Sequence, residues 1–509
     1  MKVLINLIIC VFIYSNIYSQ NRINIWQTSF GSPTYGLANE INFNSGSADT
    51  LGIIRDMNFF LCSAGICDTS GQLLFYTNGQ YIGNRNHDTL LNGYNYNPGY
   101  ATDIFYCSSG FCSGLGLIQP VIILPFPDNA DKYYLLHITG EEFPNPYGTT
   151  TFLYQPLEFR YSIVDMSLDG GMGGIPVGSK NLTLLTDTLV TGQIAAVKHG
   201  NGRDWFIFIQ KFNSNFYYKY LLTPAGIQQI PGQYLGLNSP IINDYFGSAL
   251  FSPDGNKYAH IISIVDTLNL FDFDRCTGMF SNPIYLTVPD TGIYGRILSC
   301  SFSPNNRFLY ASTHLNLYQF DLLSPNINNS RTTVATYDGF VSPFPTYFFQ
   351  HALAPDNKIY LSTYGGCNVL HVINSPDSLG VSCDVSQHSF ILPTYNNCLP
   401  NFTNYDLGKI AGSPCDTIVG INDPNKNGIF TIYPNPSPDK FWINYEIEVN
   451  SKADFHLYNS MGINVFYQTL YGTSKTLLIS TKRLSAGVYF AKINLDGKSV
   501  YVEKLIINK

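Results

Sequence analysis

A phrase of five residues recurs at a fixed interval through the middle of the chain. It reads Phe-Ser-Pro-Asp-Gly at 251–255, Phe-Ser-Pro-Asn-Asn at 302–306 and Leu-Ala-Pro-Asp-Asn at 353–357, so that successive copies start 51 residues apart. A basic residue and an apolar run follow each copy. Proline suits the second position of a type I turn, and Asp, Asn and Gly suit the positions after it. Each phrase therefore predicts a tight turn between two antiparallel strands.

A second pattern repeats in the same register. Residues 268–274 read Leu-Asn-Leu-Phe-Asp-Phe-Asp and residues 315–321 read Leu-Asn-Leu-Tyr-Gln-Phe-Asp, with a looser third copy at 369–374. A repeat of about fifty residues that holds four short strands is the signature of a β-propeller. Residues 244–375 resemble the WD-like β-propeller repeats of exported and periplasmic proteins. The resemblance implies a ring of small antiparallel sheets.

Upstream of this region the strand signal persists, although the turn phrase decays. Further strands of the same kind are predicted to start at 71–76, 132–136 and 204–208. The uneven spacing indicates insertions at 96–117 and 140–157. Six blades are then recognisable, and 22–45 and 398–412 remain at the two ends. Because a propeller removes its open sheet edges when both chain ends share one blade, we predict seven blades. Six blades, or an array of β-sandwiches, are the alternatives.

The composition agrees with an all-β chain of two folded units. Only 12% of the 509 residues are charged, while 37 Tyr, 35 Phe, 43 Gly and 28 Pro supply strand formers and turns. Helical periodicity is nowhere convincing over a long stretch, so helix should be scarce. A chain of this length exceeds one ordinary core. The net charge of −7, with both signs interspersed, argues against a nucleic-acid partner.

The N-terminus has the pattern of a signal peptide. Met1-Lys2 carries a positive charge, 3–14 is apolar except for one Asn, and 15–20 is polar. Cleavage is predicted between Ser19 and Gln20. A lipoprotein signal at Cys10 is the alternative, although Cys10 lies inside the apolar stretch. No later stretch is long and apolar enough for a membrane helix, so we expect no transmembrane segment in the mature chain.

The C-terminal region carries an ordered series of motifs. They are Tyr-Pro-Asn-Pro-Ser at 433–437, Leu-Tyr-Asn-Ser-Met-Gly at 457–462, Leu-Ser-Ala-Gly-Val-Tyr-Phe at 484–490 and Lys-Leu-Ile-Ile at 504–507. This series resembles the type A C-terminal sorting domain of the type IX (Por) secretion system of Bacteroidetes. The resemblance implies contact with the type IX machinery, export through the periplasm and across the outer membrane, and removal of the domain. The residues that match the family's motif positions are Pro434, Asn435, Pro436, Gly462, Gly487, Tyr489 and Lys504.

Together these features predict four segments. They are a signal peptide at 1–19, a β-propeller at 20–413, a linker at 414–430 and the sorting domain at 431–509. The linker is polar and rich in turn formers. Seven short alternating strands are expected in the sorting domain, which suggests a small immunoglobulin-like β-sandwich, and the family resemblance implies the same architecture.

Ten cysteines remain once Cys10 is removed with the signal. They are Cys62, Cys67, Cys107, Cys112, Cys276, Cys300, Cys367, Cys383, Cys398 and Cys415. An even number in an exported chain suggests disulfide bonds. The simplest hypothesis joins sequence neighbours, as 62–67, 107–112, 276–300, 367–383 and 398–415, but the count alone leaves the pairing open. No C-x-x-C and no suitably spaced histidine is present, so no metal ligand is predicted.

No catalytic motif stands out. The sequence lacks G-x-S-x-G and H-E-x-x-H. The glycine run 170–174 could be read as a phosphate loop, but Ser179 precedes Lys180 where such a loop needs the reverse order, so a hairpin loop is predicted. His260 and His351 stand alone in predicted strands and are interpreted as structural.

Two acid pairs could in principle serve glycoside hydrolysis or cation binding. Glu141 and Glu142 are adjacent, so their side chains diverge on an extended segment. Asp272 and Asp274 form a D-x-D that could contact a cation, but the matching repeat carries Gln319 at the first place. We therefore predict no catalytic residue and no cofactor.

Binding is the better-supported function, because a propeller offers a rigid rim of loops. We predict a secreted or cell-surface module that binds an extracellular protein or glycan. An extracellular hydrolase with its site at the channel, or a structural surface or adhesion component, is the alternative. Six Asp-Ser/Thr-apolar triplets are similar to the O-glycosylation sites of exported Bacteroidetes proteins. Their hydroxyl residues are Thr50, Thr89, Thr188, Thr267, Ser378 and Thr417.

Overall fold

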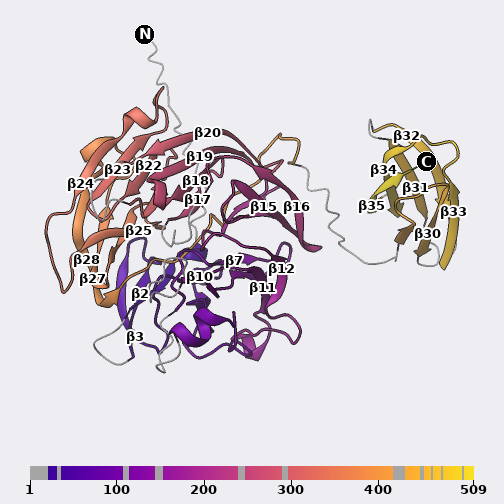
Figure 1. Cartoon of the computed structure of the whole chain (residues 1–509). Helices are drawn as coiled ribbons and strands as arrows, with labels where there is room; N and C mark the ends of the chain where they lie inside the picture. Colours follow the sequence, from indigo (N-terminus) through magenta and orange to yellow (C-terminus); the bar gives the residue numbers. More distant parts are fainter. Residues whose placement is uncertain are drawn as a thin grey trace, which may run out of the picture. The chain divides into compact units, whose positions relative to one another are not determined.

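The computed structural model consists almost wholly of antiparallel β-sheet. It describes residues 21–30, 36–106, 114–143, 153–238, 247–288, 296–416, 430–447, 452–459, 462–471, 474–495 and 498–508. The chain divides into two compact units, the first ending at Asp416 and the second starting at Thr417. The all-β prediction is confirmed, and the described helical segments are single turns (Figure 1).

Seven sheets follow one another along the first unit. The first holds β1 (Ile25–Thr28), β2 (Leu37–Asn42) and β3 (Asp49–Ile54), and the second holds β4 (Ala64–Cys67), β5 (Leu73–Thr77) and β6 (Ile82–Asn84). The third holds β7 (Val121–Pro125), β8 (Lys132–Ile138), β11 (Glu158–Asp165) and β12 (Leu182–Thr186), with the hairpin β9 (Glu141–Phe143) and β10 (Leu153–Gln155) inserted. The fourth holds β13 (Ala195–Lys198), β14 (Trp205–Gln210), β15 (Phe216–Thr223) and β16 (Gly226–Tyr234).

The last three sheets cover the repeats found in the sequence. The fifth holds β17 (Ala249–Phe251), β18 (Lys257–Ile262), β19 (Thr267–Asp274) and β20 (Met279–Thr287). The sixth holds β21 (Ser299–Phe302), β22 (Phe308–Ser312), β23 (Asn316–Asp321) and β24 (Thr332–Thr336), and the seventh holds β25 (Tyr347–Leu353), β26 (Ile359–Tyr364), β27 (Cys367–Ile373) and β28 (Val385–Asn396). The helical turns are η1 (Asn21–Ile23), η2 (Ala101–Tyr106), η3 (Asp169–Gly171), η4 (Ser263–Val265), η5 (Asn328–Ser330) and η6 (Gly380–Cys383).

The repeated phrase forms the turn between the first two strands of these three sheets. The residue that closes each turn is Gly255, Asn306 or Asn357, and its N–H donates to the carbonyl oxygen three residues earlier at 2.8–3.0 Å. All three closing residues have φ between +61° and +73°. Glycine and asparagine tolerate this left-handed conformation, which explains their place in the phrase.

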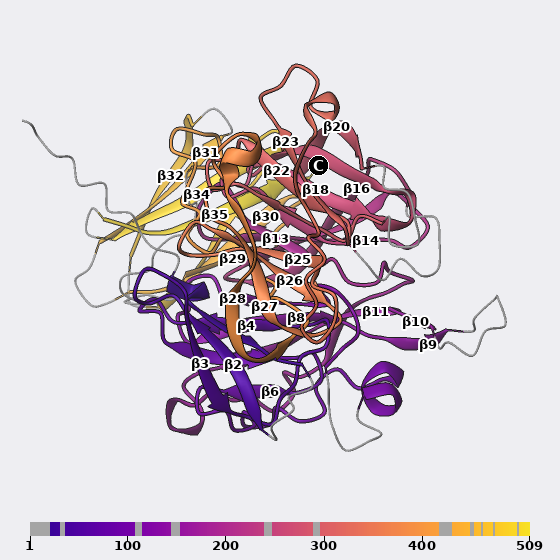
Figure 2. The same cartoon turned by 90° about the vertical axis from the view of Figure 1, so that its left-hand side faces the viewer.

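The ring closes between the first and the last sheet. Asn39 of β2 donates from Nδ2 to Thr394 O (3.0 Å) and accepts from Thr394 N (2.8 Å). Figures 1 and 2 both show indigo β2 and β3 beside orange β28. Residues 397–407 form no strand, but they pass beside β1, where the Phe402 and Trp26 ring centroids are 5.9 Å apart. The seven sheets confirm the predicted propeller, while the segment 398–412 adds no strand to the closing blade.

Aromatic side chains fill the space between neighbouring sheets. Phe206, Phe208 and Tyr217 of the fourth sheet pack with Tyr258 and Phe273 of the fifth in one buried cluster. The centroids of the Phe208 and Phe273 rings lie 5.4 Å apart with their planes perpendicular. Such edge-to-face contacts add to the energy of burial, so this part of the aromatic surplus stabilises the ring of sheets.

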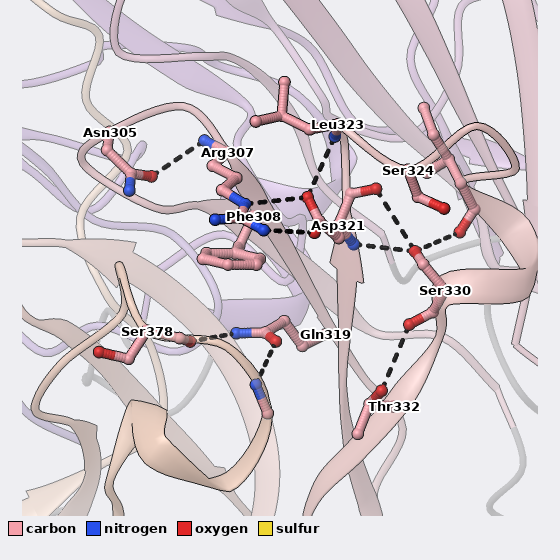
Figure 3. A network of polar contacts seen from close by, with 12 residues as sticks. Asn305, Arg307, Phe308, Gln319, Asp321, Leu323, Ser324, Ser330, Thr332 and Ser378 are labelled. Carbon is pink, nitrogen blue, oxygen red and sulfur yellow. Dashed lines mark hydrogen bonds and ion pairs between the residues drawn. The ribbon is translucent and has the colours of Figure 1, made fainter.

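A base–acid bridge recurs between the second and third strands of several sheets. Arg307 holds Asp321 through two hydrogen bonds of 3.1 and 2.8 Å (Figure 3). Lys257 holds Asp272 at 2.7 Å, and Lys132 lies 3.6 Å from Asp165. The contacts show that Asp321 is the counterpart of Asp272. The match of the repeats at 268–274 and 315–321, which places Gln319 at the position of Asp272, is therefore out of structural register by two residues.

The second unit is a sandwich of two small sheets. One holds β29 (Phe430–Tyr433), β30 (Lys440–Glu446) and β33 (Ser474–Ser480). The other holds β32 (Asn464–Leu470), β31 (Ala453–Asn459), β34 (Gly487–Leu495) and β35 (Lys498–Ile507). Alternate residues such as Phe441, Ile443, Phe455 and Leu457 form the buried core. This arrangement confirms the predicted immunoglobulin-like architecture.

Candidate functional site

A cavity of about 360 Å³ lies where the first strands of the third to seventh sheets converge. These strands contribute Ile122, Ala195–Val197, Ala249–Phe251, Cys300 with Phe302, and His351–Leu353. Because successive blades of a propeller meet only around its axis, a cavity touched by five of them lies in the central channel. The turn prolines Pro253, Pro304 and Pro355 belong to the same lining. The sequence repeat thus places equivalent turns around one end of the channel.

Small side chains leave this space open. Ala195, Ala196, Ala249, Cys300 and Ala352 stand on the first strands of four sheets and are all more than nine-tenths buried. The same residues also belong to the buried apolar clusters between neighbouring sheets, so their small size keeps both the sheet contacts and the cavity wall thin. At the other end, Leu61, Ile118, Leu298 and Phe349 form a buried apolar cluster. We interpret that cluster as a plug, so the cavity opens toward the turn prolines.

The last residues of the propeller form one wall of the cavity. Asn401 donates from Nδ2 to Val121 O (2.9 Å), Thr403 Oγ1 to Ala196 O (2.6 Å) and Asn404 Nδ2 to Pro253 O (2.7 Å). Three different sheets therefore anchor this segment, although it forms no strand. The segment mixes these polar side chains with buried apolar ones such as Leu399 and Tyr405. The contacts that anchor it are all with distant residues, so the sequence pattern offered no signal for them beyond the segment's place after the last strand.

A disulfide bond joins Cys276 to Cys415 and fixes the end of that segment. Gly200 packs against the bond, since a Cβ at this residue would come within 2.4 Å of the Cys415 Sγ. Arg275 donates to Gly408 O at 2.7 Å, and Ile410 N donates to Gly200 O at 2.8 Å. Covalent and polar contacts together hold residues 408–416 across the fourth and fifth sheets.

The predicted pairing of neighbouring cysteines is wrong at four of its five places. Cys276 is bonded to Cys415 and to neither Cys300 nor Cys398, because it lies in the turn after β19 while Cys300 lies on the first strand of the next sheet. Cys367 starts β27 and Cys383 lies beyond its far end, about 20 Å away along a seven-residue strand. The free, buried thiols are Cys62, Cys67, Cys300, Cys367, Cys383 and Cys398. Cys107 and Cys112 lie outside the described residues.

His351 lines the cavity but is held by neutral partners. Its Nδ1 lies 3.1 Å from Ser301 Oγ and its Nε2 lies 2.7 Å from Ser312 Oγ. Burial, reinforced by the nearby His371, lowers the pKa of His351 to about 3. His260 is similarly placed between Tyr217 OH and Gln193 Oε1, and burial lowers its pKa to about 3 as well. Both contacts support the structural interpretation of these histidines.

The buried histidines predict a loss of stability in acid. Because His260 stays neutral in the folded protein and protonates near pH 6.5 when unfolded, folding becomes less favourable as the pH falls from about 6.5 toward 3. His260 alone contributes a slope of up to about 1.4 kcal/mol per pH unit in that window. In urea unfolding between pH 4.5 and 7, His260→Gln should be less stable at pH 7 and show a shallower slope. An unchanged slope would contradict the assignment.

The acidic residues singled out in the sequence have other hydrogen-bond partners or lie outside the cavity lining. Asp272 bonds Lys257 and Asn282, and Asp274 accepts from Cys276 N (2.8 Å) and Thr277 Oγ1 (2.7 Å). Glu141 and Glu142 lie on the inserted strand β9, outside the cavity lining, and the glycine run 170–174 belongs to the loop between β11 and β12. In the described ranges, no group of three or more His, Cys, Asp or Glu is placed to hold a metal ion.

The motif residues of the second unit converge at one end of its larger sheet. Asn435 Oδ1 accepts from Ile506 N at 2.9 Å, and the N–H of Ser437, next to Pro436, donates to Ile506 O at 2.7 Å. Gly487 pairs with Ile507 and Tyr489 with Leu505, while Lys504 faces Phe490 across the same ladder. Gly462 closes the turn that follows Asn459, the residue paired with Tyr489. The segment around Pro434 therefore clamps the last strand.

The glycosylation triplets lie in different surroundings. Thr50, Thr89, Thr188 and Ser378 are partly accessible, whereas Thr267 is buried and its hydroxyl donates to Val265 O. A glycan at Thr267 would have to displace this hydrogen bond and the packing around a residue that is only 9% exposed. Thr417 lies outside the described residues, as do Ser19 and Gln20.

The fold and the cavity define the class of this protein: a seven-bladed β-propeller followed by a small immunoglobulin-like domain. Residues 431–508 match the secretion system C-terminal sorting domain family, which confirms the resemblance seen in the motifs. The protein is therefore delivered by type IX secretion to the cell surface or the extracellular space. Across the described ranges, no helix is long and apolar enough to cross a membrane.

Solved structures provide further comparisons. A protein of Bacteroides fragilis named as a 6-phosphogluconolactonase is 12% identical, with a TM-score of 0.39, over 74% of this chain and 97% of its own. The periplasmic gluconolactonase of Pseudomonas aeruginosa is 10% identical, with a TM-score of 0.40, over 74% and 98%. The extracellular domain of a one-component system from B. thetaiotaomicron is 12% identical, with a TM-score of 0.35, over 95% and 57%. No curated protein matches the sequence.

Proposed function

We propose that the propeller is an extracellular binding module and that the channel cavity receives part of a protein or glycan ligand. A signal peptide at 1–19 starts the export, and the sorting domain engages the type IX machinery. The linker predicted at 414–430 is shorter than expected and starts after Asp416, because Cys415 is bonded to Cys276 of the propeller and Phe430 starts β29. The observation that carries the proposal is the cavity itself, at about 360 Å³ within the usual range of small-molecule sites.

The lining favours binding over hydrolysis. No Asp or Glu is among the cavity-lining residues in the described part of the chain. Glycoside hydrolysis generally needs two carboxyl groups about 5–10 Å apart, and His351 has both ring nitrogens engaged by serines. A site of amides, hydroxyls and apolar faces can recognise a ligand without attacking it.

A cavity-filling substitution tests where binding occurs. Ala249→Leu adds three carbons at a residue that lines the cavity and also packs in the cluster between the fourth and fifth sheets. Ala225→Leu adds the same carbons at an exposed turn between β15 and β16. Overpacking at Ala249 should cost about 1–3 kcal/mol of stability, which thermal unfolding will measure. In a screen against polysaccharides and extracellular matrix proteins, the wild type and Ala225→Leu should bind alike, and Ala249→Leu at least tenfold more weakly.

Two outcomes would contradict the proposal. Equal binding by folded Ala249→Leu would place the ligand elsewhere on the protein. Uniformly negative screens of the wild type would favour a structural surface component instead.

A further inference from the structure

The cavity wall carries no charge. Asp, Glu, Lys and Arg are all missing from its lining within the described ranges. Two carboxylates of the lining turns are engaged by neighbouring hydroxyls, since Asp254 accepts from Ser252 Oγ (2.5 Å) and Asp356 from Tyr360 OH (2.8 Å). A charged ligand group would lose its hydration here without meeting an opposite charge, which is costly. The cavity therefore selects against ions.

The polar atoms of the wall include both donors and acceptors. Gln119 uses its Oε1 to accept from Ala249 N at 2.8 Å, which leaves its NH2 group to donate. Asn401 and Thr403 donate their own hydrogens to backbone carbonyls, which leaves Asn401 Oδ1 and the lone pairs of Thr403 Oγ1 to accept. A purely apolar ligand would leave such atoms unpaired. A hydroxyl-rich ligand can pair with both kinds.

Flat apolar surfaces complete the wall. Phe251 and Phe402 are half-buried, and the three turn prolines lie beside them. Aromatic faces pack well against the C–H face of a ring. A volume of about 360 Å³ is at the small end of ligand sites, with room for about one or two sugar rings.

From these three properties we infer that the cavity binds a neutral sugar ring, of the kind that ends a glycan chain. This inference rests on the proposed binding function and names its ligand. An uncharged ring with hydroxyls on its rim and C–H groups on its face matches the donors, the acceptors and the aromatic surfaces together. The ring enters past the turn prolines, and Asn357, an exposed lining residue, stands at the opening.

An isosteric change of charge at the opening tests the inference. Asn357→Asp keeps the size and the left-handed backbone of this residue (φ +61°) and adds one negative charge. Asn306→Asp makes the same change in the equivalent turn of the sixth sheet. Asn306 itself does not line the cavity, and the aspartate can keep the bond from Asp254 N (2.9 Å). The full chain and both variants are measured by calorimetry with oligosaccharides ending in neutral, uronic-acid or amino sugars, and with benzyl alcohol as an apolar probe.

The wild type should bind neutral-ended probes at least tenfold more tightly than acidic or basic ones. Asn357→Asp should change the neutral affinity less than threefold and weaken acidic probes further, while Asn306→Asp changes neither. Tighter binding of acidic or basic probes, or no binding of any sugar, overturns the inference. If the wild type binds benzyl alcohol but no sugar, and Ala249→Leu abolishes that binding, the sugar is the wrong class of ligand, although the cavity is still the binding site. Neutral-sugar binding that folded Ala249→Leu retains overturns the site as well.

Discussion

Removal of residues 431–509 traps the propeller in the periplasm. The second unit holds the whole sorting domain match, and the first unit has its own core. The truncated chain should therefore fold after crossing the inner membrane but lack the signal for the outer one. We expect loss of essentially all extracellular protein, measured by immunoblotting of medium, cell surface and periplasm. Normal amounts outside the cell would contradict the assigned route.

A milder variant tests the motif geometry separately. Asn435→Ala removes the oxygen that accepts from Ile506 N at 2.9 Å and so loosens the last strand. Losing one such bond costs about 1 kcal/mol, so export should fall without stopping. Asn464→Ala is the matched control and should leave export unchanged. It removes an exposed side chain that bonds His456 on β31 and accepts from Phe466 N of its own strand, so it also loses a bond to a backbone N–H, but away from the last strand.

Loss of the Cys276–Cys415 bond lowers the free energy of unfolding of the propeller by about 4 kcal/mol. The bond closes a loop with a sequence separation of 139, and a long closed loop restricts the unfolded chain strongly. The double variant Cys276→Ser/Cys415→Ser should show this loss in urea unfolding. Trp442→Phe in all samples leaves Trp26 and Trp205 as fluorescent reporters of the propeller.

Reduction provides the control for this experiment. A reducing agent should destabilise the wild type to the level of the double variant and leave the double variant unchanged. If reduction affects both chains equally, the buried thiols and not this bond carry the effect. If it affects neither, the bond does not stabilise the propeller.

Most of the fold could be predicted from short stretches of the sequence. The phrase at 251–255 and its copies specify turns through the residues themselves, since proline fixes φ and Gly or Asn accepts a positive φ. The strands around them alternate and repeat, so the ring of sheets could be predicted. The ordered motifs at 433–437 and 504–507 likewise carry enough local information to indicate the sorting domain.

Contacts between distant residues were decided only by the tertiary structure. Nothing local indicates that Cys276 meets Cys415, because two residues 139 apart in the sequence become neighbours only through the way the seven sheets pack around one axis. The cavity has the same origin: each small residue on a first strand is unremarkable alone, and Ala195, Ala249 and Cys300 leave a space only when the ring brings them together. Turns and strands are encoded in short stretches of sequence, whereas cavities and cross-links arise from packing.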